Sequence, residues 1–111
     1  MIGVFVFLVI FLTLSCEKKE EVKILKKISV KELVGIKGCP HCHDMRRKLL
    51  GPSFYEISNR YTEKDIDELV KSMLQGSSKK WGKFSMPPQK LTKEEAYTIA
   101  KWIIELKKKS Y

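Results

Sequence analysis

The stretch GCPHCH, residues 38–43, places Cys39 and Cys42 on either side of a Pro-His pair and directly before His43. Three chemistries accept this pattern: a redox-active dithiol, part of a zinc site, and the covalent anchor of a haem. Each of them needs a different surrounding fold. The sequence that flanks the motif therefore decides between them.

The flanking sequence favours helices on both sides of the motif. Ser29 and Thr92 each precede a glutamate by three residues, which is the pattern of a capping box. These signals predict helices over about 29–37 and 93–108. Pro52 is expected in the first turn of a second short helix, because proline is tolerated where the backbone N–H has no partner.

The clearest periodicity lies in a third predicted helix, which Thr62 opens and Gly76 ends. Its apolar residues follow the i, i+3, i+4, i+7, i+8 spacing of a helix with one buried face: Ile66, Leu69, Val70, Met73 and Leu74. A loop rich in Gly, Ser and Pro follows over 77–90, and no segment alternates as a strand. The predicted fold class is therefore all-α, with four to five short helices and a core so thin that something else is expected to fill the middle.

This helical setting argues against two of the three chemistries. Cys-Pro-His-Cys is also the active pattern of periplasmic dithiol oxidases, but there the motif follows a strand inside a βαβ unit. A structural zinc site needs four ligands, and no Cys or His follows His43. A thiol–disulfide oxidoreductase with Cys39 as its nucleophile is kept as the alternative function.

The pattern C-x-x-C-H fits covalent haem attachment. The thiols of Cys39 and Cys42 would add to the two haem vinyl groups and form thioethers. His43, next to the second anchor, would then be the proximal iron ligand. His41 lies between the cysteines, and the same geometry predicts that it points away from the iron as a surface residue.

A haem iron that only transfers electrons is expected to have a sixth ligand, and three methionines are candidates for it. Met45 is too close to His43 to reach the opposite face, and Met73 lies on the apolar stripe of a helix, where core packing explains it. Met86 precedes Pro87 and Pro88, which stiffen the loop. Met86 is therefore the predicted ligand; a haem sensor or peroxidase-like enzyme would instead keep this position open.

The order of these motifs resembles that of the class I cytochromes c, in particular the small bacterial monohaem type. The resemblance covers about residues 28–108 and rests on GCPHCH, LGPSF, GSSKKWGKFSMPP and EEAYTIAKWI. It implies first and last helices that cross each other around one covalent haem c. It also implies a non-enzymatic electron carrier between a respiratory donor complex and a terminal oxidase or reductase.

The same resemblance implies roles for three further residues. The carbonyl of Pro52 would accept a hydrogen bond from the His43 imidazole and fix its orientation. Trp81, five residues before Met86, would donate to a haem propionate. Ser77 would help in the same way.

The N-terminal residues predict export. Residues 2–14 are apolar but shorter than the roughly 20 residues of a membrane-spanning helix, as in the core of a secretory signal. Ser15-Cys16 resembles the cleavage site of bacterial lipoproteins. We expect a lipoprotein-like signal at 1–15, a charged tether at 16–27, a cytochrome c domain at 28–111, and a periplasmic protein with a membrane anchor at Cys16.

The charge of the chain bears on its partners. Lys and Arg number 22 against 13 Asp and Glu, a formal net charge of +9. The domain is expected to be exported, and its sequence shows no basic–aromatic face, so we expect no nucleic-acid binding. We expect a monomer whose partners are redox proteins with acidic docking faces. A Lys/Glu-rich surface is also typical of thermostable proteins. The basic residues that flank the motifs are Lys37, Arg46, Arg47, Lys48, Lys79, Lys80 and Lys83.

Overall fold

The structure, a computed structural model, describes residues 28–109. The predicted signal, the tether and Cys16 lie outside the described residues. Within residues 28–109 we find no helix with the length and apolar character needed to cross a bilayer.

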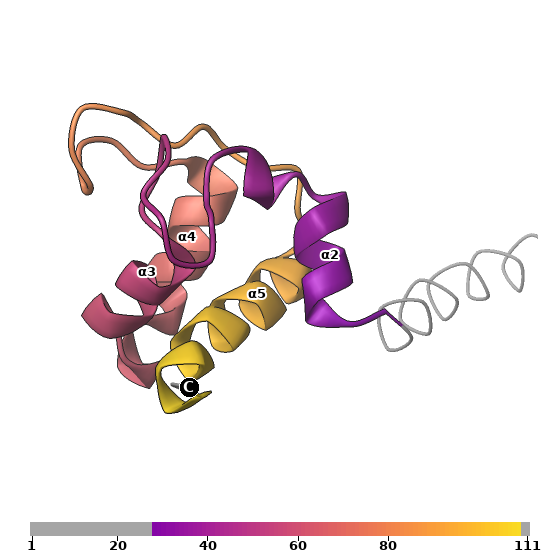
Figure 1. The fold of residues 1–111 in the computed structure, drawn as a ribbon. Helices are drawn as coiled ribbons and strands as arrows, with labels where there is room; N and C mark the ends of the chain where they lie inside the picture. The colour runs from indigo at the N-terminus through magenta and orange to yellow at the C-terminus, as the bar shows by residue number, and fades with distance from the viewer. Residues whose placement is uncertain (1–27, 110–111) are drawn as a thin grey trace, which may run out of the picture.

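The described part of the chain is all-α, as predicted (Figure 1). Its β pairing is limited to an isolated antiparallel bridge between Ser77 and Met86. The α-helices are α2 (Val30–Ile36), α3 (Phe54–Arg60), α4 (Ile66–Gln75) and α5 (Lys93–Glu105), and short 3-10 turns cover Cys39–His41, Glu63–Asp65 and Leu106–Lys109.

The residues predicted as N-caps lie at or near the starts of these helices. The side chains of Ser29 and Thr92 each accept a hydrogen bond from the backbone N–H three residues on, as predicted. The box at Thr62 instead opens a 3-10 turn, and α4 begins only at Ile66.

Two predicted boundaries were wrong. Pro52 does not lie in the first turn of α3, because Ser53 is the N-cap and forms a capping box with Glu56. The last α-helix ends at Glu105 rather than at Lys108, and the chain tightens into a 3-10 turn beyond it. A tightened last turn is a common way to satisfy the carbonyl groups at a helix end.

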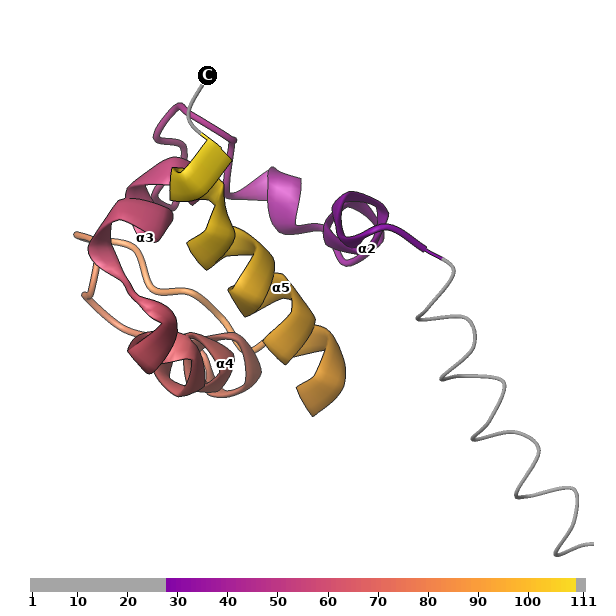
Figure 2. The same cartoon turned by 90° about the horizontal axis from the view of Figure 1, so that it is seen from below.

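The first and last described helices, α2 and α5, pack across each other (Figures 1 and 2). Leu33 and Val34 of α2 are buried in the same core as Ile99 and Ile103 of α5. An ion pair between Lys37 Nζ and Glu95 Oε2 at 3.2 Å joins the end of α2 to the start of α5.

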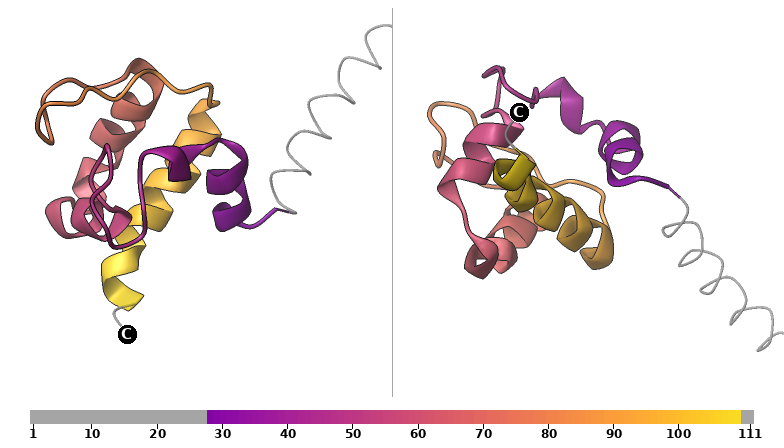
Figure 3. Two further views of the ribbon diagram at one scale, coloured as in Figure 1. Left: turned by 45° about the horizontal axis from the view of Figure 1, so that its top comes forward. Right: turned by 60° about the horizontal axis from the view of Figure 1, so that its bottom comes forward.

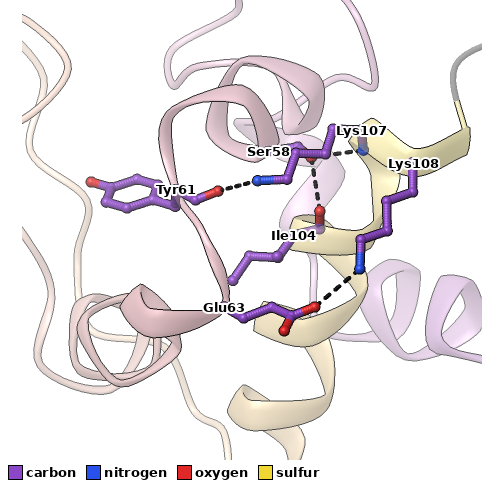
Figure 4. A network of polar contacts seen from close by, with 6 residues as sticks. All are labelled: Ser58, Tyr61, Glu63, Ile104, Lys107 and Lys108. Atoms are coloured by element: carbon purple, nitrogen blue, oxygen red, sulfur yellow. Dashed lines mark hydrogen bonds and ion pairs between the residues drawn. The ribbon is translucent and has the colours of Figure 1, made fainter.

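A polar network closes the other end of α5 (Figure 4). The buried Ser58 hydroxyl of α3 donates to the Ile104 carbonyl at 3.3 Å and accepts from the Lys107 backbone N–H at 2.9 Å. Lys107 Nζ donates to the Tyr61 carbonyl at 2.8 Å. These bonds satisfy backbone groups that the helix end would otherwise leave without partners.

Candidate functional site

The helices do not fill the middle of the domain. A cavity of about 310 Å³ lies among them. One wall comes from the segment that runs from the cysteine motif to α3, and another from the loop between α4 and α5. Figure 3 shows the course of both segments. All seven residues predicted for the site line this cavity: Cys39, Cys42, His43, Pro52, Ser77, Trp81 and Met86.

The His43 imidazole is held by its neighbour in the fold. Its Nδ1 lies 2.7 Å from the carbonyl oxygen of Pro52, which is buried. Because a carbonyl can only accept, Nδ1 carries the proton and donates it. Nε2 is then the nitrogen with a free lone pair, and a ring nitrogen with a free lone pair can bind a metal.

Gly51 gives the imidazole its room, and the sequence reading missed it. A Cβ at Gly51 would lie 2.6 Å from Cε1 and 2.9 Å from Nδ1 of His43. The backbone N–H of Gly51 also donates to the Cys42 carbonyl at 2.9 Å. The signal was present as the glycine directly before Pro52, but nothing in the sequence says which ring approaches it.

The two cysteines reach the cavity from a tight turn. Gly38 precedes this turn with φ of 78°, a left-handed conformation that suits glycine. The backbone N–H of Cys42 donates to the Cys39 carbonyl at 3.2 Å, so both half-buried thiols lie on one turn. His41, between them, is exposed and is not part of the cavity wall.

The environment of Cys39 does not suit a thiol nucleophile. Burial raises the pKa of its thiol, and the charge of a neighbouring Cys42 thiolate would raise it further. Dithiol oxidoreductases depend on the opposite, a lowered thiol pKa. The absence of strands from residues 28–109 also removes the βαβ setting, so the thiol–disulfide alternative finds no support.

Met86 is fixed through its backbone. It exchanges two hydrogen bonds with Ser77, of 2.8 and 3.0 Å. Gly76, at φ of 81°, lies so close that a Cβ there would be 2.7 Å from the Met86 carbonyl oxygen. The half-buried side chain of Met86 lines the cavity.

The other two methionines are placed differently. Met45 is not part of the cavity wall. Met73 belongs to the buried core, as predicted, although its side chain also reaches the cavity. Its carbonyl accepts from the Gln89 backbone N–H at 2.8 Å, which ties the far end of the loop to α4.

Trp81 sits in a cluster that the sequence did not reveal. The Arg60 guanidinium of α3 lies 4.3 Å from the Trp81 ring centroid, within the range of a cation–π contact. Arg60 also donates to the Lys80 carbonyl at 3.0 Å, and the Tyr61 ring lies 6.3 Å from Trp81. Because about twenty residues separate these partners, no local pattern predicts the contact.

The cavity suits a haem and does not suit a zinc ion. Most of its lining is apolar, and its lining residues include two thiols, one imidazole and one thioether. Within the described chain, no three His, Cys, Asp or Glu side chains lie together to hold a metal ion. Fold and site thus define a small helical haem protein.

Comparisons with known proteins agree with this class. No family model matches the chain. Cytochrome c-551 of Pseudomonas denitrificans is 37% identical over 78 residues, which cover 68% of this chain and 95% of that protein. Cytochrome c-552 of Hydrogenobacter thermophilus is 38% identical over 78 residues, covering 68% of this chain and 80% of that protein.

A solved structure gives the same result. The crystal structure of wild-type cytochrome c552 of Nitrosomonas europaea matches with a TM-score of 0.65 and 29% identity, over 68% of this chain and 98% of that one. The chain belongs to the class I monohaem cytochrome c family and carries one covalently bound haem c.

Proposed function

We propose that the protein is an electron carrier rather than an enzyme, with one haem c held by Cys39 and Cys42 and ligated by His43 and Met86. The observation that carries this proposal is that all four side chains line one cavity although Met86 is far from the others in sequence. When bound, the haem supplies an iron that gains and loses one electron.

The protein groups around the haem each have a separate task. The hydrogen bond from His43 to Pro52 fixes the imidazole and makes it a stronger ligand. The bridge between Ser77 and Met86 fixes the backbone that carries the thioether. With His43 and Met86 as ligands, the iron would have no open position, which would favour electron transfer over oxygen chemistry.

Trp81 and Ser77 are proposed to bind the haem propionates. Both line the cavity, and the Arg60 contact holds the Trp81 ring in place. An indole N–H that is drawn into such a site normally seeks an acceptor, and a carboxylate provides one.

The cellular setting is part of the proposal. Residues 1–15 direct export, Cys16 anchors the chain through lipid, 16–27 is the tether, and 28–111 is the domain on the periplasmic side of the envelope. There the monomer moves electrons between a respiratory donor complex and a terminal oxidase or reductase.

The partners are proposed to be redox proteins with acidic docking faces, not nucleic acid. Lys79 and Lys83 are exposed on the loop that lines the cavity, and Lys83 directly precedes Phe84, which is 62% exposed. Such encounters bury little surface and weaken as salt screens the charges.

A visible spectrum and an intact mass of the purified full-length chain test the proposal. We expect a reduced-minus-oxidised c-type spectrum, and a mass that includes one haem and the acyl chains at Cys16. Thiol alkylation should leave Cys39 and Cys42 unmodified. Uptake of the reagent at both cysteines in colourless protein would refute the proposal.

A further inference from the structure

One charged side chain in the cavity wall has no part in the proposed haem attachment or iron ligation. Among the described residues that line the cavity, Lys80 is the only one with a permanently positive side chain. It lies beside Trp81 on the loop between α4 and α5. A haem carries two propionate carboxylates, and an ammonium group in the wall of its cavity can bind one of them as a charge-assisted hydrogen bond.

Two side chains of α4 hold the Lys80 ammonium. Lys80 Nζ lies 3.1 Å from Glu68 Oε1 and 3.0 Å from Ser72 Oγ. Ser72 also lines the cavity. An ammonium group has three N–H donors, and these contacts take two of them. The third donor can serve a carboxylate inside the cavity.

The backbone of Lys80 is fixed from another helix. Arg60 of α3 donates to the Lys80 carbonyl at 3.0 Å, and its guanidinium stacks on the adjacent Trp81 ring. Lys80 is therefore held at both its carbonyl and its ammonium. Although Lys80 is exposed, these contacts give its charge a defined position at the cavity wall.

We propose that Lys80 binds a haem propionate and raises the reduction potential, and that Glu68 sets how strongly it does so. This inference rests on the proposed function. An ionised propionate favours the more positive ferric iron, and a neighbouring cation offsets that charge and favours the ferrous state. Glu68 competes for the same ammonium, so its carboxylate weakens the effect.

The contribution of the pair to stability should be small. The side chains of Lys80 and Glu68 are 35% and 48% exposed, and ion pairs of this kind add little to the free energy of unfolding. Variants at these positions are therefore expected to fold and to attach haem, which makes the reduction potential the useful readout.

Spectroelectrochemical titration of the intact holoprotein tests the role of Lys80. Lys80→Met should lower the potential more than Lys83→Met, which removes the same charge from an exposed residue of the same loop outside the cavity wall. Lys80→Arg keeps the charge and should restore most of the potential. Equal shifts in Lys80→Met and Lys83→Met would overturn the proposal, because net charge alone would then explain both.

The acidic partner gives an independent test of opposite sign. Glu68→Gln should raise the potential, whereas Glu63→Gln, which breaks an exposed pair with Lys108, should change it less. In the Lys80→Met background Glu68→Gln should lose most of its effect, since interacting residues are not additive. An undiminished effect of Glu68→Gln in that background would refute the coupling.

The wild-type spectrum separates this inference from the proposed function. An oxidised spectrum without a methionine–iron band would refute Met86 as a ligand, while the comparison of Lys80 with Lys83 could still be made on the attached haem. Wild-type protein without haem would overturn both.

Discussion

The two walls of the cavity are built in different ways. In the segment from Gly38 to α3, the contacts act directly on the chemistry: Pro52 binds the imidazole of His43, and Gly51 sets the space for it. In the loop from Gly76 to α5, the hydrogen bonds that fix Met86 act on its backbone, while Lys80 and Trp81 are held through their side chains.

This difference suggests a division of labour. If the proposed roles hold, the first wall determines whether haem is held at all, because its groups would form the covalent bonds and supply the stronger ligand. The second wall would then determine how the bound iron behaves, because a thioether is a weak ligand whose position depends on the loop. Variants in the two walls should therefore change different observables.

The largest effect is expected from removing both anchors. The double variant Cys39→Ala, Cys42→Ala should lose covalent haem entirely, because no thioether can form. Acid–acetone extraction and an intact mass measure the loss. His41→Ala, an exposed change within the same motif, should keep the haem; if it loses the haem as well, the motif is not behaving as two sulfur anchors.

The next effect lies in the second wall. Met86→Ala should retain covalent haem but lose the methionine–iron charge-transfer band of the oxidised protein and have a lower reduction potential. Met73→Leu, a volume-conserving core change, should keep the band at a stability cost below about 1.5 kcal/mol. A band that survives in Met86→Ala and disappears in Met73→Leu would reassign the ligand.

A smaller effect should come from crowding the imidazole. Gly51→Ala places a methyl group against a ring that Pro52 holds in position, and overpacking of this kind costs about 1–3 kcal/mol. Denaturant unfolding of the holoprotein measures it. Gly35→Ala is the matched control: it has open space around it inside α2 and should stabilise by roughly 0.5–1 kcal/mol. Equal effects of the two changes would show that the ring yields freely.

The smallest effect is a pH dependence at the contact between α2 and α5, away from both walls. Burial alone would raise the pKa of the Glu95 carboxyl, but the Thr92 backbone N–H and the Lys37 ammonium hold it below the ordinary value of 4.5. A carboxyl with a lowered folded-state pKa stabilises the fold above its unfolded pKa, and this stability is lost as the pH falls through the folded pKa.

Urea unfolding between about pH 7 and about pH 3 measures this loss, since glutamate titrates within that range. Glu95→Gln should remove part of the decline in stability, while the exposed Glu94→Gln should not. The remainder is expected from Asp44 and Glu63, whose pKa values are lowered by the Arg47 backbone N–H and by Lys108. An unchanged decline in Glu95→Gln would contradict the assignment.

What the sequence could predict was local or strongly patterned. The capping signals at Ser29 and Thr92 span three residues, and the stripe of α4 repeats with the helical period. Ser29 and Thr92 are N-caps as predicted, although the full capping box forms only at Thr92, and the α4 stripe was confirmed. The cysteine motif and the methionine before two prolines each identify a site residue by its immediate neighbours. The structure brings these residues to one cavity, and their roles as haem ligands stay predictions.

What the sequence could not predict depends on contacts between distant segments. Arg60 and Trp81 meet only because α3 and the loop fold together. Ser58 gives no signal, because a buried serine in a short helix breaks no apolar pattern, yet it joins α3 to the end of α5. Pro52 was misplaced because proline suits both the first helical turn and the residue before an N-cap.

The packing of α2 on α5 also bears on the order in which parts of the fold can form as the chain emerges. A chain that emerges from its N-terminus presents Leu33 and Val34 long before the residues that cover them, and the Ser58 bonds wait for Lys107, almost the last residue described. Until those residues are present, the core next to the cysteine turn is incomplete. On the proposed function, both sulfurs would be accessible during this period, so that a large planar molecule could be joined to them before the helices close around it.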